Sequence, residues 1–137
     1  MANEVNLDAC AAVAFVAEGS TVRHYLRSVV SGKDLVMTRT ALREFQGSLA
    51  AAAGPSEQAR ALRLLARLRI IPDGPSPRAQ ALRPTNNLEA EDIIILGTGD
   101  ALGIATVTSD RRAVSAARSQ RANIRVLLHP SEPLKGV

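Results

Sequence analysis

Residues 92–110 read DIIILGTGDALGIATVTSD, and this stretch decides the fold of the chain. An apolar helix is expected over about residues 88–101, and Gly103 is placed to end it in a left-handed turn. A strand over residues 104–108 follows, and Asp110 comes directly after it. Because open α/β sheets bind ligands beyond the carboxyl ends of their strands, Asp110 is a candidate site residue.

The same alternation of helix and strand extends in both directions from this stretch. Further strands are expected over residues 3–9, 35–38, 69–72 and 124–128. Helices are expected over residues 11–17, 21–31, 40–53, 56–68, 78–82 and 110–121. This alternation predicts an α/β fold, a three-layer α/β/α sandwich with a central, mainly parallel sheet of four or five strands. With 137 residues, the chain suits one domain.

Composition favours a soluble cytoplasmic protein. The single cysteine excludes an internal disulfide, and no apolar run approaches the roughly 20 residues that a membrane span requires. No secretory leader is recognisable, so we expect a reducing cytoplasm and no membrane association. Aromatic residues make up only 2% of the chain, which argues against stacking on nucleobases as the main mode of binding.

The positive charge of the chain is carried almost entirely by arginine. Of 17 basic residues only Lys33 and Lys135 are lysines, and the formal net charge is +4. Arginine suits phosphate recognition, but a net charge this small permits nucleic-acid binding without indicating it. The helix over 56–68 places Arg60, Arg63 and Arg67 opposite its apolar side. We interpret these three as a solvated face, with RNA contact as the lesser alternative.

Four acidic residues stand where such a sheet would bring them to one edge: Asp8, Glu44, Asp92 and Asp110. Asp8 and Asp110 each close an apolar strand, and the other two lie near the start of helical patterns. Carboxylates gathered in one pocket repel each other, so they persist as a set only around a cation or with raised pKa values. Ligands that are all oxygen suit Mg²⁺ or Mn²⁺ and not zinc.

At this point the sequence resembles the PIN-domain nucleases, whose small members include VapC-like ribonuclease toxins. Residues 92–110 are similar to that family's run of an acidic residue, an apolar helix, a glycine stop, a strand and a Thr-x-Asp ending. Residues 5–9 resemble its opening strand with Asp8, and residues 40–45 resemble the helix that carries its second acid, here Glu44. The resemblance covers nearly the whole chain and implies a single PIN-like domain over residues 1–137.

The resemblance implies a metal-dependent endoribonuclease that hydrolyses RNA phosphodiester bonds. Asp8, Glu44, Asp92 and Asp110 would coordinate one or two Mg²⁺ or Mn²⁺ ions, and Thr108 would orient the site by hydrogen bonding. By analogy with the family, we expect the toxin of a toxin–antitoxin pair, an antitoxin or immunity protein as partner, and a homodimer.

The chain departs from the family pattern directly after Asp8. A hydroxyl or amide residue commonly follows within two positions, whereas Ala9 and Cys10 stand here, so support for Asp8 would come from Asn6 or Ser109. This departure keeps a catalytically inactive PIN-like domain that binds RNA or protein as one alternative. A metal-dependent hydrolase of small phosphoesters is another.

Simpler roles remain open for the acidic residues. Asp110 suits the N-cap of the helix that follows it, and Glu44 suits a solvated helix face. Glu91 competes with Asp92, because either could flank the apolar face of the same helix.

Arginine and histidine complete the candidates. Arg111 and Arg112 could contact RNA phosphates beside the metal site, or could lie exposed on a first helical turn. His24 and His129 are far from the acidic motifs in the sequence, and no Ser-His-Asp or Cys-His pattern indicates a protein nucleophile.

Overall fold

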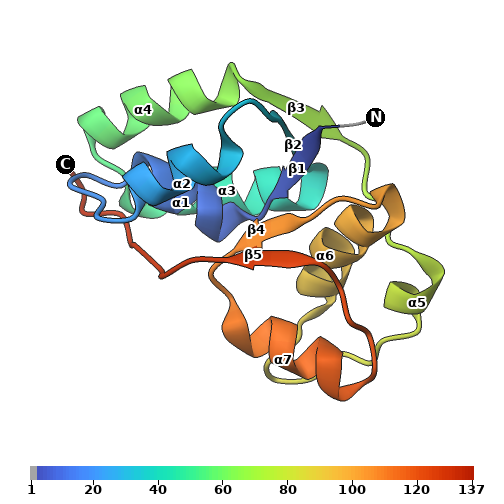
Figure 1. The fold of residues 1–137 in the computed structure, drawn as a ribbon. Helices are drawn as coiled ribbons and strands as arrows, with labels where there is room; N and C mark the ends of the chain where they lie inside the picture. Colours follow the sequence, from blue (N-terminus) through green and yellow to red (C-terminus); the bar gives the residue numbers. More distant parts are fainter. Residues whose placement is uncertain (1–2) are drawn as a thin grey trace.

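Five parallel strands form the central sheet in the order β3-β2-β1-β4-β5 (Figure 1). The computed structural model describes residues 3–137. The strands are β1 (Glu4–Leu7), β2 (Asp34–Thr38), β3 (Leu68–Ile71), β4 (Thr106–Thr108) and β5 (Val126–Leu128). The predicted parallel sheet and its strand number are confirmed.

Helices cover both faces of this sheet. They are α1 (Ala9–Val16), α2 (Arg23–Val30), α3 (Arg39–Ala52), α4 (Pro55–Leu65), α5 (Pro77–Gln80), α6 (Ala90–Leu102) and α7 (Arg111–Ser119). The larger core packs α1–α4 against one face, and a second apolar cluster joins α5, α6 and α7 on the other (Figure 1). Within residues 3–137, none of the helices has the length and apolar character needed to span a membrane.

The direction of strand addition reverses between β1 and β4, and this reversal positions the site. From β1 the chain adds β2 and then β3 on one side, and it then crosses to add β4 and β5 on the other. Gly103 ends α6 in the predicted left-handed conformation, with φ of 69°, just before β4. Asp8 follows β1 and Asp110 follows β4, so both lie at the point where such sheets bind ligands.

Close packing of α6 against the sheet accounts for two glycines inside this helix. A Cβ atom on Gly99 would overlap Oγ1 of Thr106 and lie 3.2 Å from Nδ2 of Asn6. A Cβ atom on Gly97 would lie 2.6 Å from the Cβ of Ala79 in α5. The glycines therefore let the backbone of α6 approach both neighbours, which offsets their low helix propensity.

Two helices begin earlier than the sequence pattern indicated, because other side chains cap them. Asp8 accepts a hydrogen bond from the backbone N–H of Ala9 at 2.7 Å, so α1 starts immediately after β1. Thr38 caps α3 by accepting from the N–H of Ala41 at 3.0 Å, whereas the hydroxyl of Thr40, where the helix was expected to begin, donates to Asp73 at 2.7 Å. Strand and helix are thus joined without a loop in both places, which holds the start of each helix at the edge of the sheet.

The last residues of the chain are tied to α4 by a buried carboxylate. Glu57 is fully buried. Its oxygens accept hydrogen bonds from the backbone N–H groups of Glu18, Gly54, Lys135, Gly136 and Val137. Burial alone would raise the pKa of Glu57, but these donors lower it to about 2. The segment after β5 is therefore held along the outside of the molecule by one side chain.

Candidate active site

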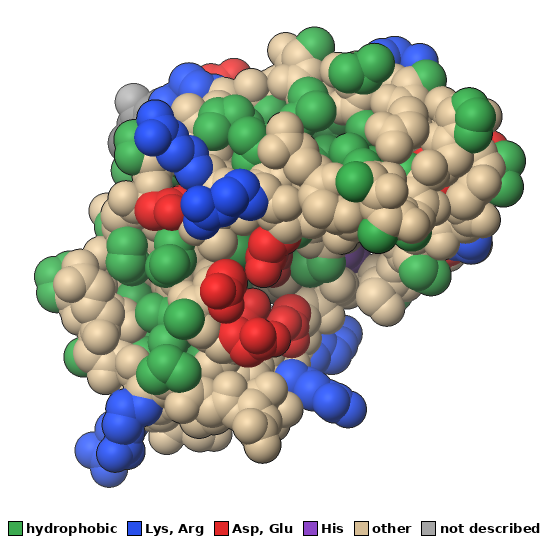
Figure 2. All heavy atoms as spheres, turned by 180° about the vertical axis from the view of Figure 1, so that it is seen from behind, with side chains coloured by type: hydrophobic (Ala, Val, Ile, Leu, Met, Phe, Trp, Pro, Cys, Tyr) green, Lys and Arg blue, Asp and Glu red, His purple; other side chains and the backbone are tan. Residues whose placement is uncertain are grey.

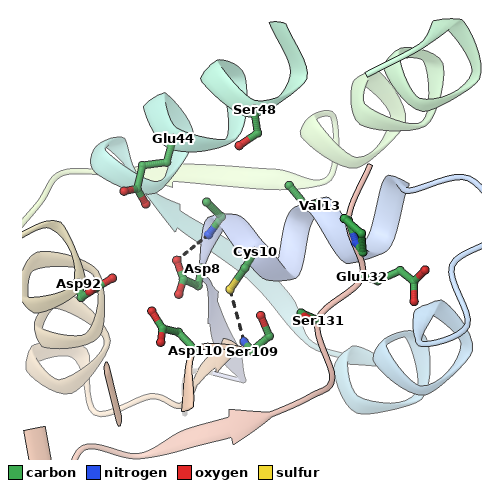
Figure 3. Close-up of a pocket in the computed structure, with 12 residues that line it drawn as sticks. Asp8, Cys10, Val13, Glu44, Ser48, Asp92, Ser109, Asp110, Ser131 and Glu132 are labelled. Carbon is green, nitrogen blue, oxygen red and sulfur yellow. Dashed lines mark hydrogen bonds between the residues drawn. The ribbon is translucent and has the colours of Figure 1, made fainter. Parts of the chain in front are cut away.

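A pocket of about 580 Å³ lies at the carboxyl edge of the sheet, beside the ends of β1 and β4. Figure 2 shows acidic side chains gathered around a hollow on one face of the molecule. In the close-up of Figure 3, Asp8, Glu44, Asp92 and Asp110 point toward a common space from four different segments. The structure therefore brings all four candidate carboxylates to one pocket.

The position of Asp8 is set by two hydrogen bonds. Its Oδ1 accepts from the N–H of Ala9 and its Oδ2 accepts from Oγ1 of Thr108, each at 2.7 Å. Burial raises the pKa of Asp8, and the hydrogen bonds from Thr108 and Ala9 counter part of that rise. The carboxylate is fixed at the base of the pocket, where it is only 9% exposed.

Asp110 and Asp92 each cap a helix while lining the pocket. Oδ1 of Asp110 accepts from the N–H of Ala113 at 3.0 Å, so its N-cap role and its place in the pocket coexist. Oδ2 of Asp92 accepts from the N–H of Glu89 at 2.9 Å at the start of α6. Glu91, the competing acid, is exposed and does not line the pocket.

Desolvation and neighbouring charges raise the pKa values of two carboxylates in the pocket. The Glu44 side chain is exposed at the pocket rim, but its partial desolvation there raises its pKa to about 7, and the charges of Asp8 and Asp92 add to the rise. Burial likewise raises the pKa of Asp92 to about 6, and the charges of Asp110 and Asp8 add to that effect. The pocket thus has a negative potential that a cation would relieve.

The donor set fits a hard divalent cation in its chemistry. Within residues 3–137, the Glu44 carboxylate accepts no hydrogen bond, and Asp92 and Asp110 each use only one carboxylate oxygen. In the same part of the chain, no three Asp, Glu, His or Cys side chains stand close enough together to form a ready-made ion-binding group. Because the Glu44 side chain is exposed, it has the most freedom to move toward the other three carboxylates.

Cys10 occupies the place where a hydroxyl or amide was expected, and it makes comparable contacts. Its Sγ lies 3.4 Å from Oγ1 of Thr108 and accepts from the N–H of Ser109 at 3.3 Å. Burial raises the pKa of Cys10 to about 11, and the nearby charge of Asp8 adds to the rise. The side chain is therefore a neutral thiol that links β4 to α1, not a nucleophile.

The three residues expected to support the site have different roles in the structure: Thr108, Asn6 and Ser109. Asn6 and Ser109 donate no hydrogen bond to Asp8 within the described residues, and that support comes from Thr108 instead. Asn6 donates to the backbone oxygen of Ile95 at 3.0 Å and so holds α6. Ser109 lines the pocket. Support for the site is thus divided between a direct partner and residues that position its walls.

Arg111 and Arg112 lie exposed at the start of α7, immediately after Asp110. They line a neighbouring hollow of about 540 Å³ together with Thr85 and Asn87, and not the acidic pocket itself. A polymer bound at Asp110 could reach them, whereas a small ligand held among the carboxylates would not.

Sequence patterns missed a third wall of the pocket. Ser131, Glu132 and Pro133, from the segment after β5, line it opposite α3 (Figure 3). His129 is far from the acidic residues in the sequence but lies close to the end of β4 in the fold. Its backbone N–H donates to the backbone oxygen of Thr108 at 3.1 Å. No local pattern marks this segment, although an acid at the third position of a helix that begins at Pro55 could have drawn attention to Glu57, whose Oε1 accepts from the N–H of Gly54 at 3.1 Å.

Residues 5–136 match a family described as a protein of unknown function (DUF1308). The chain belongs to the DUF1308 family. This match includes every residue of the sheet except Glu4 and every residue that lines the acidic pocket. The family assignment carries no activity with it.

The DUF1308 chain has a PIN-like fold that is similar to several solved structures. It matches a chain of VapBC2 from Rickettsia felis, bound to a DNA fragment from its promoter, with a TM-score of 0.62 and 15% identity, covering 91% of this chain and 98% of that one. PAE2754 from Pyrobaculum aerophilum gives a TM-score of 0.60 at 15% identity, with 90% and 83% covered.

A third similar structure is VapC20 from Mycobacterium tuberculosis, described as a toxin that cleaves the sarcin-ricin loop. It gives a TM-score of 0.54 at 14% identity, covering 74% of the DUF1308 chain and 86% of the toxin. At such low identity these similarities establish the fold alone. The function of the DUF1308 pocket has to be argued from its own residues.

Proposed function

We propose that this protein is a Mg²⁺- or Mn²⁺-dependent ribonuclease that hydrolyses RNA phosphodiester bonds. The observation that carries the proposal is the convergence of Asp8, Glu44, Asp92 and Asp110 on one pocket at the switch point of a parallel sheet. The raised pKa values of Glu44, about 7, and of Asp92, about 6, are what a site built to hold a cation would show without one.

The chain itself would bind and orient the reacting groups. Asp8, held by Thr108, and Asp92 and Asp110, held at helix starts, would supply the fixed carboxylates, with Glu44 closing over them. When bound, Mg²⁺ or Mn²⁺ supplies an activated water and neutralises charge on the phosphate. Arg111 and Arg112 would bind phosphates of the RNA that extend beyond the pocket.

The fold comparisons support this activity without establishing it. The similarity to VapC20, a toxin described as cleaving an RNA loop, favours RNA over small phosphoesters as the substrate. The similarity to VapBC2 favours a toxin whose activity is controlled by an antitoxin or immunity protein. A homodimer belongs to the same proposal by analogy with such toxins.

A second candidate function is a catalytically inactive domain that binds RNA or a protein. One observation favours it: within residues 3–137, the acidic side chains of the pocket are not close enough to form a ready-made ion-binding group. On that account the carboxylates would serve as a negatively charged surface and no bond would be cleaved.

A cleavage assay separates the two functions. Purified protein is incubated with end-labelled single-stranded and hairpin RNAs in Mg²⁺, Mn²⁺ or EDTA, beside Asp8→Asn, Asp110→Asn and the matched control Glu91→Gln. We expect cleavage only with metal, a loss of at least about 100-fold in the two aspartate variants, and full activity in the control. RNA that is bound but never cleaved would favour the inactive domain, and hydrolysis of a phosphomonoester alone would favour a small substrate.

A further inference from the structure

Five arginines line a second pocket, to which α1, α2 and α4 contribute, and α1 contacts both of the other helices. They are Arg23, Arg27, Arg60, Arg63 and Arg67. Arg23 and Arg27 are four residues apart on α2, and Arg60 and Arg63 are three apart on α4, so each pair lies on one face of its helix. Arg67 lies in the turn between α4 and β3. The sequence pattern indicates a solvated arginine face on the helix over 56–68 alone. In the folded chain, the two arginines of α2 line the same pocket as that face.

This pocket holds a large excess of positive charge. The carboxylate paired with it is Glu18, which Arg60 engages through both carboxylate oxygens at 2.9 and 2.6 Å. Five arginines against one carboxylate leave an excess of four charges, as large as the formal net charge of the whole chain, +4. Such repulsion within and between two helices costs stability, so an anion that neutralises it would bind favourably.

Two of the arginines are held in place and three are free to bind. Nε of Arg23 donates to the backbone oxygen of Phe15 at 2.6 Å, and Arg60 is held by Glu18. Within residues 3–137, no hydrogen bond occupies the guanidinium groups of Arg27, Arg63 and Arg67, which are exposed at the rim. The pocket thus has two guanidinium groups held by hydrogen bonds and three whose donors are available to an anion.

We propose that this arginine pocket binds a phosphate group. A tetrahedral phosphate offers more acceptor oxygens than a carboxylate and can accept from several guanidinium forks at once. The volume of about 210 Å³ admits one such group rather than an extended acidic segment. Buried Leu64 and Val16 also line it, and apolar neighbours of this kind lower the local dielectric and strengthen the charge interactions.

The phosphate could come from the backbone of a nucleic acid or from free inorganic phosphate. Binding at the arginine pocket does not depend on any activity of the acidic pocket.

Titration calorimetry of the full chain in EDTA uses inorganic phosphate in one arm and a short single-stranded RNA in the other. Binding of inorganic phosphate identifies a free anion as a sufficient ligand, whereas RNA binding without it identifies the polymer backbone. The test variant is Arg27→Gln with Arg63→Gln, and the matched control is Arg118→Gln with Arg121→Gln, two exposed arginines outside the pocket.

We expect the test variant to weaken binding roughly 100-fold, because two charge-assisted hydrogen bonds are lost, and the control to change it little. A melting curve in phosphate-free buffer checks that both variants fold. On the unaltered protein, phosphate should protect Arg27 and Arg63 from an arginine-specific dicarbonyl reagent. Equal losses in both variants, absence of binding in both arms, or binding of polyglutamate in preference to either ligand would overturn the proposal.

Discussion

Thr108 donates a hydrogen bond of 2.7 Å to Asp8 across a separation of 100 residues. The bond joins the end of β4 to the end of β1 at the point where the strand order reverses. Both residues are buried: Thr108 is completely inaccessible to solvent, and Asp8 is 9% exposed. The same hydroxyl accepts from the N–H of Asp110 at 3.1 Å, so one side chain sets the relative positions of two candidate metal ligands.

Replacing Thr108 by valine should therefore weaken both the fold and the site. The buried carboxylate of Asp8 loses a donor, and we expect the free energy of unfolding to fall by about 2 kcal/mol at neutral pH. Urea denaturation measures this loss. Thr108→Ser keeps the hydroxyl and is the control, and equal losses in both variants would show that the hydrogen bond is not the cause.

The stability of the metal-free protein should decline as pH rises toward neutrality. The pKa values of Glu44 and Asp92, about 7 and about 6, lie above their ordinary values of 4.5 and 3.8. Their contribution to stability is therefore complete below the ordinary values and is lost as pH rises through the folded-state values. Because Glu44 is exposed, the change should be about 1 kcal/mol or less.

Melting temperatures in EDTA across this pH range test that decline. The melting temperature of the double variant Glu44→Gln with Asp92→Asn should change less with pH than that of the unaltered protein. At the upper end of the pH range the double variant should be the more stable of the two. Parallel curves for the two proteins would contradict the repulsion inferred among the carboxylates.

Gly99→Ala should separate α6 from the sheet. The added Cβ would overlap Oγ1 of Thr106, and overpacking of this kind costs about 1–3 kcal/mol. Gly47→Ala is the matched control, since Gly47 also lies inside a helix but has open space around it. We expect that control to gain about 0.5–1 kcal/mol in unfolding free energy. A gain of the same size from Gly99→Ala would refute the close approach.

Removing the carboxylate of Glu57 should release the segment that forms the third wall of the acidic pocket. Glu57→Ala leaves several buried backbone donors without a partner, and we expect a loss of at least about 3 kcal/mol by urea denaturation. Glu18→Gln, which affects a partly exposed ion pair, should cost less than about 1 kcal/mol. Cleavage by a protease near residues 131–135 should accelerate in Glu57→Ala alone, and unchanged cleavage would contradict the anchoring role.

The same carboxylate gives the protein an acid-sensitive component. Its pKa of about 2 lies below the ordinary value of 4.5, so its contribution is complete above that value and is lost as pH falls toward 2. Acid unfolding of the unaltered protein should therefore begin in this window. The Glu57→Ala variant should show a smaller dependence there.

The alternation of strand and helix was sufficient to predict the sheet, because short stretches with buried apolar residues, such as residues 35–37, alternate with helical patterns. Gly103 also ends α6 where a glycine stop was expected. Helix starts were predicted less well. Whether Thr38 or Thr40 caps α3 depends on Asp73, which lies 33 residues from Thr40 and occupies its hydroxyl. Competition of this kind depends on the tertiary structure and leaves no local signal.

The candidate site divides in the same way. Asp8 and Asp110 could be predicted, since strand ends of a parallel sheet share an edge. The wall formed by Ser131 and Glu132 could not, because its position depends on the anchor at Glu57. The arginine pocket likewise needs α2 beside α4, and the spacing on each helix alone does not show that they face a common space.

If the four carboxylates hold a catalytic divalent cation, they should bind Mn²⁺. Electron paramagnetic resonance of Mn²⁺ measures this binding directly. Full-length protein should bind Mn²⁺ at the acidic pocket, and Asp92→Asn or Asp110→Asn should weaken that binding at least about tenfold. Glu91→Gln, next to Asp92 but outside the pocket, should bind as the unaltered protein does. Equal affinity in all of these proteins, or no Mn²⁺ binding by any of them, would contradict the claim.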